Sequence, residues 1–114
     1  MLFAEKFSNQ ELYVKGKNNK AVLIVHGFTA PLSDTDIFFD YFKLKKYTVA
    51  RPILAGHETR EIYFNGFFGP EDWLKELEDW ILKVGEKVEE IFIIGVSFGA
   101  NLSLCEAVKN NPKI

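Results

Sequence analysis

Ser97 lies between two glycines in the run Gly95-Val96-Ser97-Phe98-Gly99, directly after four apolar residues and directly before a stretch with helical character. A G-x-S-x-G pentapeptide between a strand and a helix holds its serine on a sharp, strained turn with the hydroxyl exposed. Glycine fits at the two outer positions because larger side chains there would clash with neighbouring backbone. The pattern makes Ser97 a candidate nucleophile for acyl transfer, and the alternative is a glycine-rich turn with an idle serine.

The segments around this pentapeptide alternate between strand patterns and helix patterns. The predicted strands cover 12–14, 21–25, 47–50 and 91–94, and the predicted helices cover 34–46, 70–85 and 98–109. The apolar runs at 21–25 and 91–94 are typical of strands buried on both faces of a parallel sheet. Asp34 is the expected N-cap of the first helix. The order predicts the α/β class, with three parallel strands, an N-terminal edge strand and helices on both faces.

Two further motifs precede the serine. His26-Gly27-Phe28-Thr29 follows the strand at 21–25, and Gly56-His57-Glu58 lies in the loop after the next strand. In this order the three motifs resemble the N-terminal half of an α/β-hydrolase, closest in style to bacterial carboxylesterases and monoacylglycerol lipases, including the serine aminopeptidase-like group. The sequence departs from that pattern at Glu58, where relatives usually have glycine, and at Thr29-Ala30-Pro31.

The resemblance implies that Ser97 is the nucleophile of a serine hydrolase of carboxylic esters, working through an acyl-enzyme. The backbone N–H groups of Phe28 and Phe98 would form the oxyanion hole, since two fixed amide donors stabilise the negative charge of a tetrahedral intermediate. The remaining implied site residues are the turn glycines Gly95 and Gly99 and the oxyanion-loop residues His26 and Gly27.

A serine hydroxyl also needs a base and a carboxylate that orients the base, and in this fold both follow the nucleophile in the chain. No histidine follows Ser97, and Glu106 is the only later acid. We interpret His26 and His57 as anchors of their loops. We therefore expect residues 1–114 to form a single partial domain, truncated before the strands that carry the acid and the histidine, and to be inactive alone.

Strand 91–94 would then have an unprotected apolar edge. A second hypothesis follows, in which the chain is a non-catalytic module that pairs with itself or a partner through this edge. The first hypothesis instead implies a small ester as the ligand. Phe64, Phe67 and Phe68 either line an acyl pocket or plug their loop onto the sheet.

The net charge of −2 gives no electrostatic case for nucleic acid or anionic membranes. No apolar run is long enough to span a bilayer. Cys105, the only cysteine, is expected to be a buried thiol, and nothing indicates an oxidising compartment, so we expect a cytoplasmic protein. No spacing typical of a metal or nucleotide site occurs, and we expect no cofactor.

Overall fold

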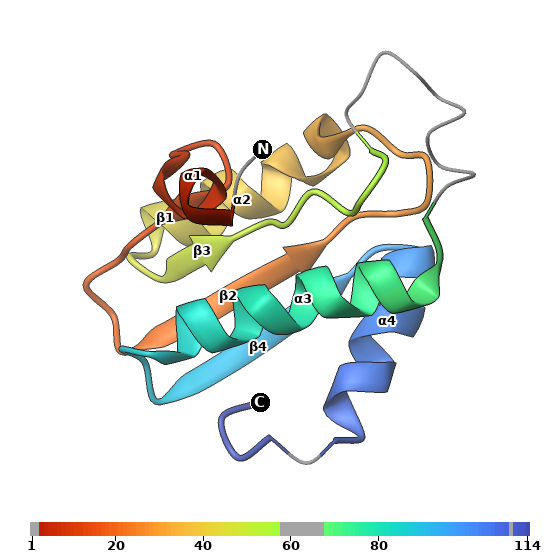
Figure 1. Cartoon of the computed structure of the whole chain (residues 1–114). Coiled ribbons are helices and arrows are strands. Elements are labelled where there is room, and N and C mark those ends of the chain that lie inside the picture. Colours follow the sequence, from red (N-terminus) through yellow and green to blue (C-terminus); the bar gives the residue numbers. More distant parts are fainter. Residues whose placement is uncertain (1–2, 58–67, 110) are drawn as a thin grey trace.

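The computed structural model describes residues 3–57, 68–109 and 111–114 (Figure 1). Its helices are α1 (Phe3–Ser8), α2 (Asp36–Leu44), α3 (Pro70–Gly85) and α4 (Phe98–Ala107), with a short 3-10 helix η1 (Leu32–Thr35). Its strands are β1 (Tyr13–Val14), β2 (Lys20–Val25), β3 (Thr48–Ala50) and β4 (Glu90–Gly95). Strands and helices alternate from β2 onward, which confirms the predicted α/β class.

The four strands form one sheet in the order β1-β3-β2-β4. Strands β3, β2 and β4 are parallel and β1 lies at the edge, as the sequence predicted. The structure adds that β1 pairs antiparallel with β3. Val25 at the end of β2 is in register with Gly95 at the end of β4. The loops that follow β2, β3 and β4 therefore leave from the same end of the sheet.

Residues of β2 alternate between two layers of the core. Ala21, Leu23 and Val25 belong to the cluster that includes the buried side chains of α3 and α4, whereas Val22 and Ile24 pack with Phe39 of α2. Figure 1 shows the same division, with α3 across one face of the sheet and α2 on the other. The chain thus leaves β2 toward one face and leaves β4 toward the opposite face. In open α/β sheets, ligands bind in the crevice that such a divergence creates.

Helix α3 is formed as its sequence predicts. Pro70 occupies the first turn, and the Asp72 carboxylate accepts the Gly69 N–H at 2.8 Å. Both features favour helix initiation at this point. The apolar stripe is buried against the sheet and comprises Trp73, Leu77, Trp80, Ile81 and Val84.

Helix α1 was not predicted from the sequence. It is only six residues long and is held by α3, because the Lys6 ammonium lies 2.9 Å from the Glu76 carboxylate and the Phe7 ring meets the Trp80 ring edge-on at 4.8 Å. An isolated helix of this length is unstable in water, so its formation depends on these contacts.

Three local expectations were wrong. Asp34 does not cap a helix over 34–46, because it lies within η1 and Thr35 takes the N-cap position of α2. The Cys105 thiol, which was expected to be buried, is exposed. The reason is that helix α4 has apolar residues on all sides, so their spacing could not identify its buried face. The side chain of Phe92 in β4 is 46 % exposed, so this strand is not covered on both faces.

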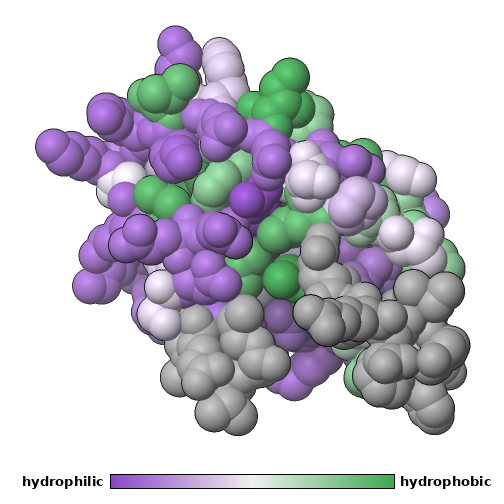
Figure 2. Space-filling view, turned by 90° about the horizontal axis from the view of Figure 1, so that it is seen from above, coloured by the Kyte–Doolittle hydropathy of each residue, from purple (hydrophilic) through white to green (hydrophobic). Residues whose placement is uncertain are grey.

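Residues 111–114 fold back against the start of β4, where the Ile91 N–H donates to the Lys113 carbonyl at 2.6 Å. This contact satisfies one donor of the outer edge of β4, an edge that the apolar sequence of the strand predicts to be open. On the face seen in Figure 2, hydrophobic patches lie between hydrophilic side chains. None of the helices in the described ranges combines the length and the apolar character that crossing a membrane requires.

Candidate active site

Ser97 is the residue at which the chain turns from β4 into α4. It occupies the N-cap position of α4 with φ 56° and ψ −118°. These angles match the first central position of a type II′ turn, which glycine normally occupies because a β-carbon is strained there. The side chain is exposed to solvent. The backbone therefore presents the hydroxyl outward on a strained turn, as the pentapeptide predicts.

The two glycines of the pentapeptide allow this turn to pack. A β-carbon on Gly99 would lie 2.1 Å from the Val25 carbonyl oxygen, and one on Gly95 would lie 2.4 Å from the Ala100 α-carbon. Both distances are far below van der Waals contact with backbone atoms that cannot move aside. Only glycine at these positions lets α4 begin directly against the end of β2.

The loop after β2 lies beside Ser97. A β-carbon on Gly27 would be 3.5 Å from the Ser97 β-carbon, so the backbone of this loop passes next to the serine. Residues 27–30 form a turn in which the Ala30 N–H donates to the Gly27 carbonyl at 3.1 Å. The Phe28 and Phe98 rings meet edge-on, with centroids 5.9 Å apart. Two residues expected to supply oxyanion donors are thus neighbours in space.

Neither the Phe28 N–H nor the Phe98 N–H donates a hydrogen bond to another residue of the described part of the chain. For Phe98 this follows from its place at the start of α4, where the first amide groups of a helix have no partner within the helix. The positive end of the helix dipole also lies there and favours a negatively charged oxygen. Within residues 3–57, 68–109 and 111–114, nothing competes with a ligand oxygen for either amide.

Both histidines use their ring nitrogens on backbone groups. His26 Nδ1 contacts the Gly27 carbonyl at 2.8 Å, and its Nε2 accepts the Leu54 N–H at 3.1 Å. His57 Nε2 accepts the Thr29 N–H at 2.7 Å, and its Nδ1 lies 3.3 Å from the Ala55 carbonyl. Each ring thus links the loop after β2 to the loop after β3. In this arrangement neither histidine has a ring nitrogen available to take a proton from Ser97.

Glu106, the only acid after Ser97 in the sequence, is directed elsewhere. Glu106 as a whole residue is 5 % exposed, and its carboxylate lies 3.1 Å from the Lys109 ammonium. Burial raises the pKa of Glu106, although Lys109 opposes this effect. The residue pairs with Lys109, just beyond the end of its own helix, and does not orient either histidine.

Aromatic side chains surround the Phe28 turn. The Trp73 ring lies 5.4 Å from both the Phe28 ring and the Phe98 ring, and the Phe28 ring lies 5.7 Å from that of His57. The Trp73 indole N–H also donates to the Ala55 carbonyl at 2.9 Å, a tie that the amphipathic pattern of α3 did not reveal.

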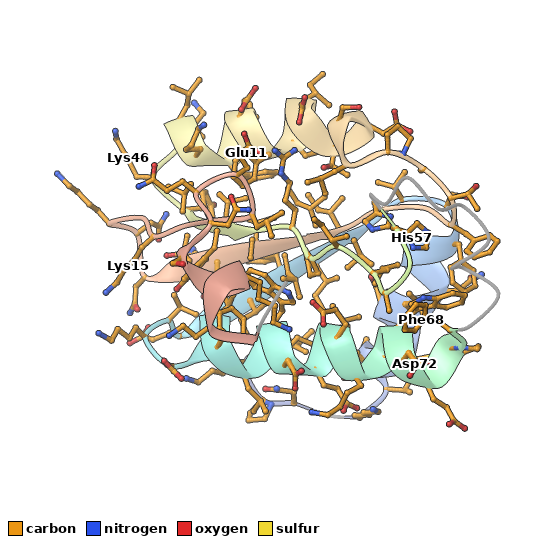
Figure 3. The ribbon with its side chains drawn as sticks, turned by 45° about the horizontal axis from the view of Figure 1, so that its top comes forward. Glu11, Lys15, Lys46, His57, Phe68 and Asp72 are labelled. Atoms are coloured by element: carbon orange, nitrogen blue, oxygen red, sulfur yellow. The ribbon has the colours of Figure 1, made fainter. Side chains whose placement is uncertain are left out.

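Figure 3 places His57 and Phe68 at the same end of the molecule, near the start of α3, with Lys15 and Lys46 at the opposite end. Phe68 is 39 % exposed. Phe64 and Phe67, the other two candidate pocket residues, and Glu58, the departure from the family pattern, lie outside the described residues.

Comparison with known proteins gives the class to which this geometry is related. The chain is 35% identical over 89 residues to a carboxylesterase of Bacillus subtilis (strain 168), an alignment that covers 75% of this chain and 35% of that protein. It is 32% identical over 94 residues to a thermostable monoacylglycerol lipase of Bacillus sp. (strain H-257), covering 82% of this chain and 36% of the lipase. The chain therefore spans about a third of the length of these relatives.

A solved structure from work on LipS and LipT, two metagenome-derived lipolytic enzymes, superposes with a TM-score of 0.81 at 28% identity. The superposition covers 86% of this chain and 39% of that one. No protein-family profile matches the chain. Together the matches show that the chain is related to esterases and lipases with an α/β-hydrolase fold, as the three sequence motifs predicted.

Proposed function

We propose that Ser97 is the nucleophile of a carboxylic ester hydrolase that works through an acyl-enzyme. The observation that carries this proposal is the glycine-like conformation of Ser97, φ 56° and ψ −118°, in an exposed serine beside the Gly27–Ala30 turn. A residue in such a conformation is strained, and strain of this kind is concentrated at functional sites. An idle serine would gain nothing from it, because glycine would fit the same turn without strain.

In the proposed reaction the Ser97 oxygen attacks the ester carbonyl, and the carbonyl oxygen becomes negatively charged. The Phe28 and Phe98 N–H groups donate to that oxygen. Losing one such donor costs about 2.7–4 kcal/mol of transition-state stabilisation in well-characterised enzymes. The alcohol then leaves with the proton that a base has taken from the Ser97 hydroxyl, and water hydrolyses the acyl-serine.

The base and the acid of this reaction come, on this proposal, from outside residues 1–114, which form part of a larger hydrolase domain. Both ring nitrogens of His26 and of His57 already contact backbone groups, which supports a base from outside these residues. The names of both relatives favour an enzyme over a non-catalytic module that pairs through the edge of β4.

The substrate class that we propose is a small ester with an apolar acyl group. The exposed Phe28 ring and the Phe98 ring, both packed against the buried Trp73, form an apolar surface beside the serine on which such a group could pack. The single cysteine of the chain fits a reducing, cytoplasmic compartment.

The test supplies the missing base as a small molecule. The chain is mixed with p-nitrophenyl acetate with and without imidazole, and mass spectrometry locates the acyl group. We expect imidazole to accelerate acetylation of Ser97 in the wild type and in Ser103→Ala, but not in Ser97→Ala, whose rate gives the direct reaction of imidazole with the ester. Ser103 is a matched control because it lies on the same helix and its hydroxyl donates to the Gly99 carbonyl at 2.7 Å. Equal p-nitrophenol release by all three proteins, with no acetyl group on Ser97, would overturn the proposal.

A further inference from the structure

The turn at residues 27–30 distributes its backbone N–H groups unevenly. The Ala30 N–H donates to the Gly27 carbonyl at 3.1 Å, and the Thr29 N–H donates to His57 Nε2 at 2.7 Å. The Phe28 N–H between them has no acceptor among the described residues. The turn is therefore built so that the one amide assigned to the oxyanion hole stays available.

Thr29 is held in an unfavourable conformation. Its φ is 60°, in the left-handed region that a β-branched residue rarely adopts. A positive φ at the third residue of a turn is typical of type II, and rotating the preceding peptide plane would convert the turn to one without that strain. That plane joins Phe28 to Thr29, and its N–H is the group that His57 accepts. The hydrogen bond to His57 thus opposes the rotation that would relieve the strain.

His57 is itself fixed in place. Its side chain is almost wholly buried, at 6 % exposure, and its Nδ1 faces the Ala55 carbonyl at 3.3 Å. Since Nε2 accepts the Thr29 N–H, the ring proton of the neutral form must sit on Nδ1. The same Ala55 carbonyl accepts the Trp73 indole N–H at 2.9 Å, which ties the loop to α3. A series of contacts therefore connects α3 with the loop after β3 and, through His57, with the peptide plane between Phe28 and Thr29.

We propose that His57 is a positioning residue for the oxyanion hole, acting through the Thr29 N–H to hold the conformation of the turn in which Phe28 supplies an amide to the oxygen of the reacting carbonyl. This inference rests on the proposed function of Ser97. His57 acts as a hydrogen-bond acceptor with a fixed tautomer and neither takes nor gives a proton during the reaction.

The test uses four variants and the imidazole-assisted acetylation of Ser97. His57→Gln places an oxygen where Nε2 stands, whereas His57→Asn is polar but too short to reach Thr29. His57→Phe keeps the ring among the neighbouring aromatic side chains and removes the acceptor. Thr29→Gly, combined with His57→Phe, removes the strain that would drive the rotation once the acceptor is gone.

We expect His57→Phe and His57→Asn to lower the acetylation rate of Ser97 by about 10²-fold, as losing one oxyanion donor does. His57→Gln should stay within about threefold to tenfold of the wild type, and adding Thr29→Gly to His57→Phe should recover about tenfold. Nitrogen-15 spectra of the wild-type ring should show an unprotonated Nε2. Circular dichroism and thermal unfolding identify the variants that remain folded, and the Gln and Asn pair alone decides the matter if Phe is not tolerated.

Two outcomes separate the failure of this inference from that of the proposed function. Equal acetylation of Ser97 in folded His57→Gln and His57→Asn proteins would overturn the role of His57 and leave Ser97 as the nucleophile. Absence of imidazole-dependent acetylation of Ser97 in the wild type would overturn the proposed function, and the positioning role with it. A wild-type spectrum with the ring proton on Nε2 would also overturn the positioning role.

Discussion

Replacing Ser97 by glycine is expected to stabilise the folded chain, although it removes the proposed nucleophile. At φ 56° and ψ −118° the serine β-carbon is strained, and glycine adopts this conformation freely. The Ser97 side chain is exposed and makes no hydrogen bond within the described residues, so its loss sacrifices no contact there. Relief of strain is therefore the main effect of the substitution on the folded state.

The size of the gain follows from two opposing contributions. A residue held in a sparsely populated region costs about 1–3 kcal/mol. Glycine also has more conformational freedom in the unfolded chain, which lowers the free energy of unfolding by about 0.5–1 kcal/mol and offsets part of the gain. The net gain should be about 1 kcal/mol, the middle of the difference between the two ranges, which corresponds to a rise in Tm of about 4 °C for a domain of this size.

Thermal unfolding followed by circular dichroism measures this gain, and two further variants act as controls. Ser97→Ala keeps a β-carbon and should change stability by no more than about 0.5 kcal/mol. Lys46→Gly removes a β-carbon at φ 68°, just beyond the end of α2 and far from the site, and should be stabilising for the same reason. The reasoning is refuted if Lys46→Gly stabilises the chain while Ser97→Gly and Ser97→Ala have equal stability.

The remaining predictions concern packing, charge and turnover. Gly99→Ala should lower the free energy of unfolding, measured by denaturant titration, by at least about 3 kcal/mol, because its β-carbon would lie 2.1 Å from a carbonyl oxygen. Gly69→Ala should be nearly neutral in the same titration, because the space around Gly69 is open. Glu106→Gln should raise Tm at pH 7, because burial raises the folded-state pKa of Glu106 and the charged carboxylate therefore opposes folding. The gain in Tm should vanish below about pH 4.3, where glutamate is neutral in the unfolded chain as well as in the folded one. Without imidazole, residues 1–114 should show no multiple-turnover ester hydrolysis that depends on Ser97, and a steady-state rate abolished by Ser97→Ala would contradict the assigned roles of both histidines.

The parts of the fold that the sequence predicted are those whose signals are local. The apolar run at 21–25 and the proline-acid start of α3 each specify an element without reference to the rest of the chain. The pentapeptide around Ser97 likewise predicted a strained turn, because only glycine at 95 and 99 permits it. These elements were placed to within one or two residues.

The parts that the sequence could not predict depend on contacts between distant residues. Helix α1 depends on the ion pair between Lys6 and Glu76, two residues that are 70 positions apart in the chain. The buried side of α4 is chosen by its neighbours, since the helix has apolar residues all around, and the exposed thiol of Cys105 follows from that choice. The hydrogen bond between Thr29 and His57 joins loops 28 residues apart, and neither loop sequence contains a signal for it.

The central claim is that an exposed Ser97 hydroxyl faces two backbone amides, those of Phe28 and Phe98. The most direct measurement is a crystal structure of the protein after reaction with a p-nitrophenyl alkylphosphonate, which leaves a tetrahedral group on the serine. The account predicts phosphorus bonded to Ser97 Oγ and one phosphonyl oxygen about 2.7–3.1 Å from both amide nitrogens. A phosphonyl oxygen directed into solvent, with neither amide within hydrogen-bonding distance, would contradict it.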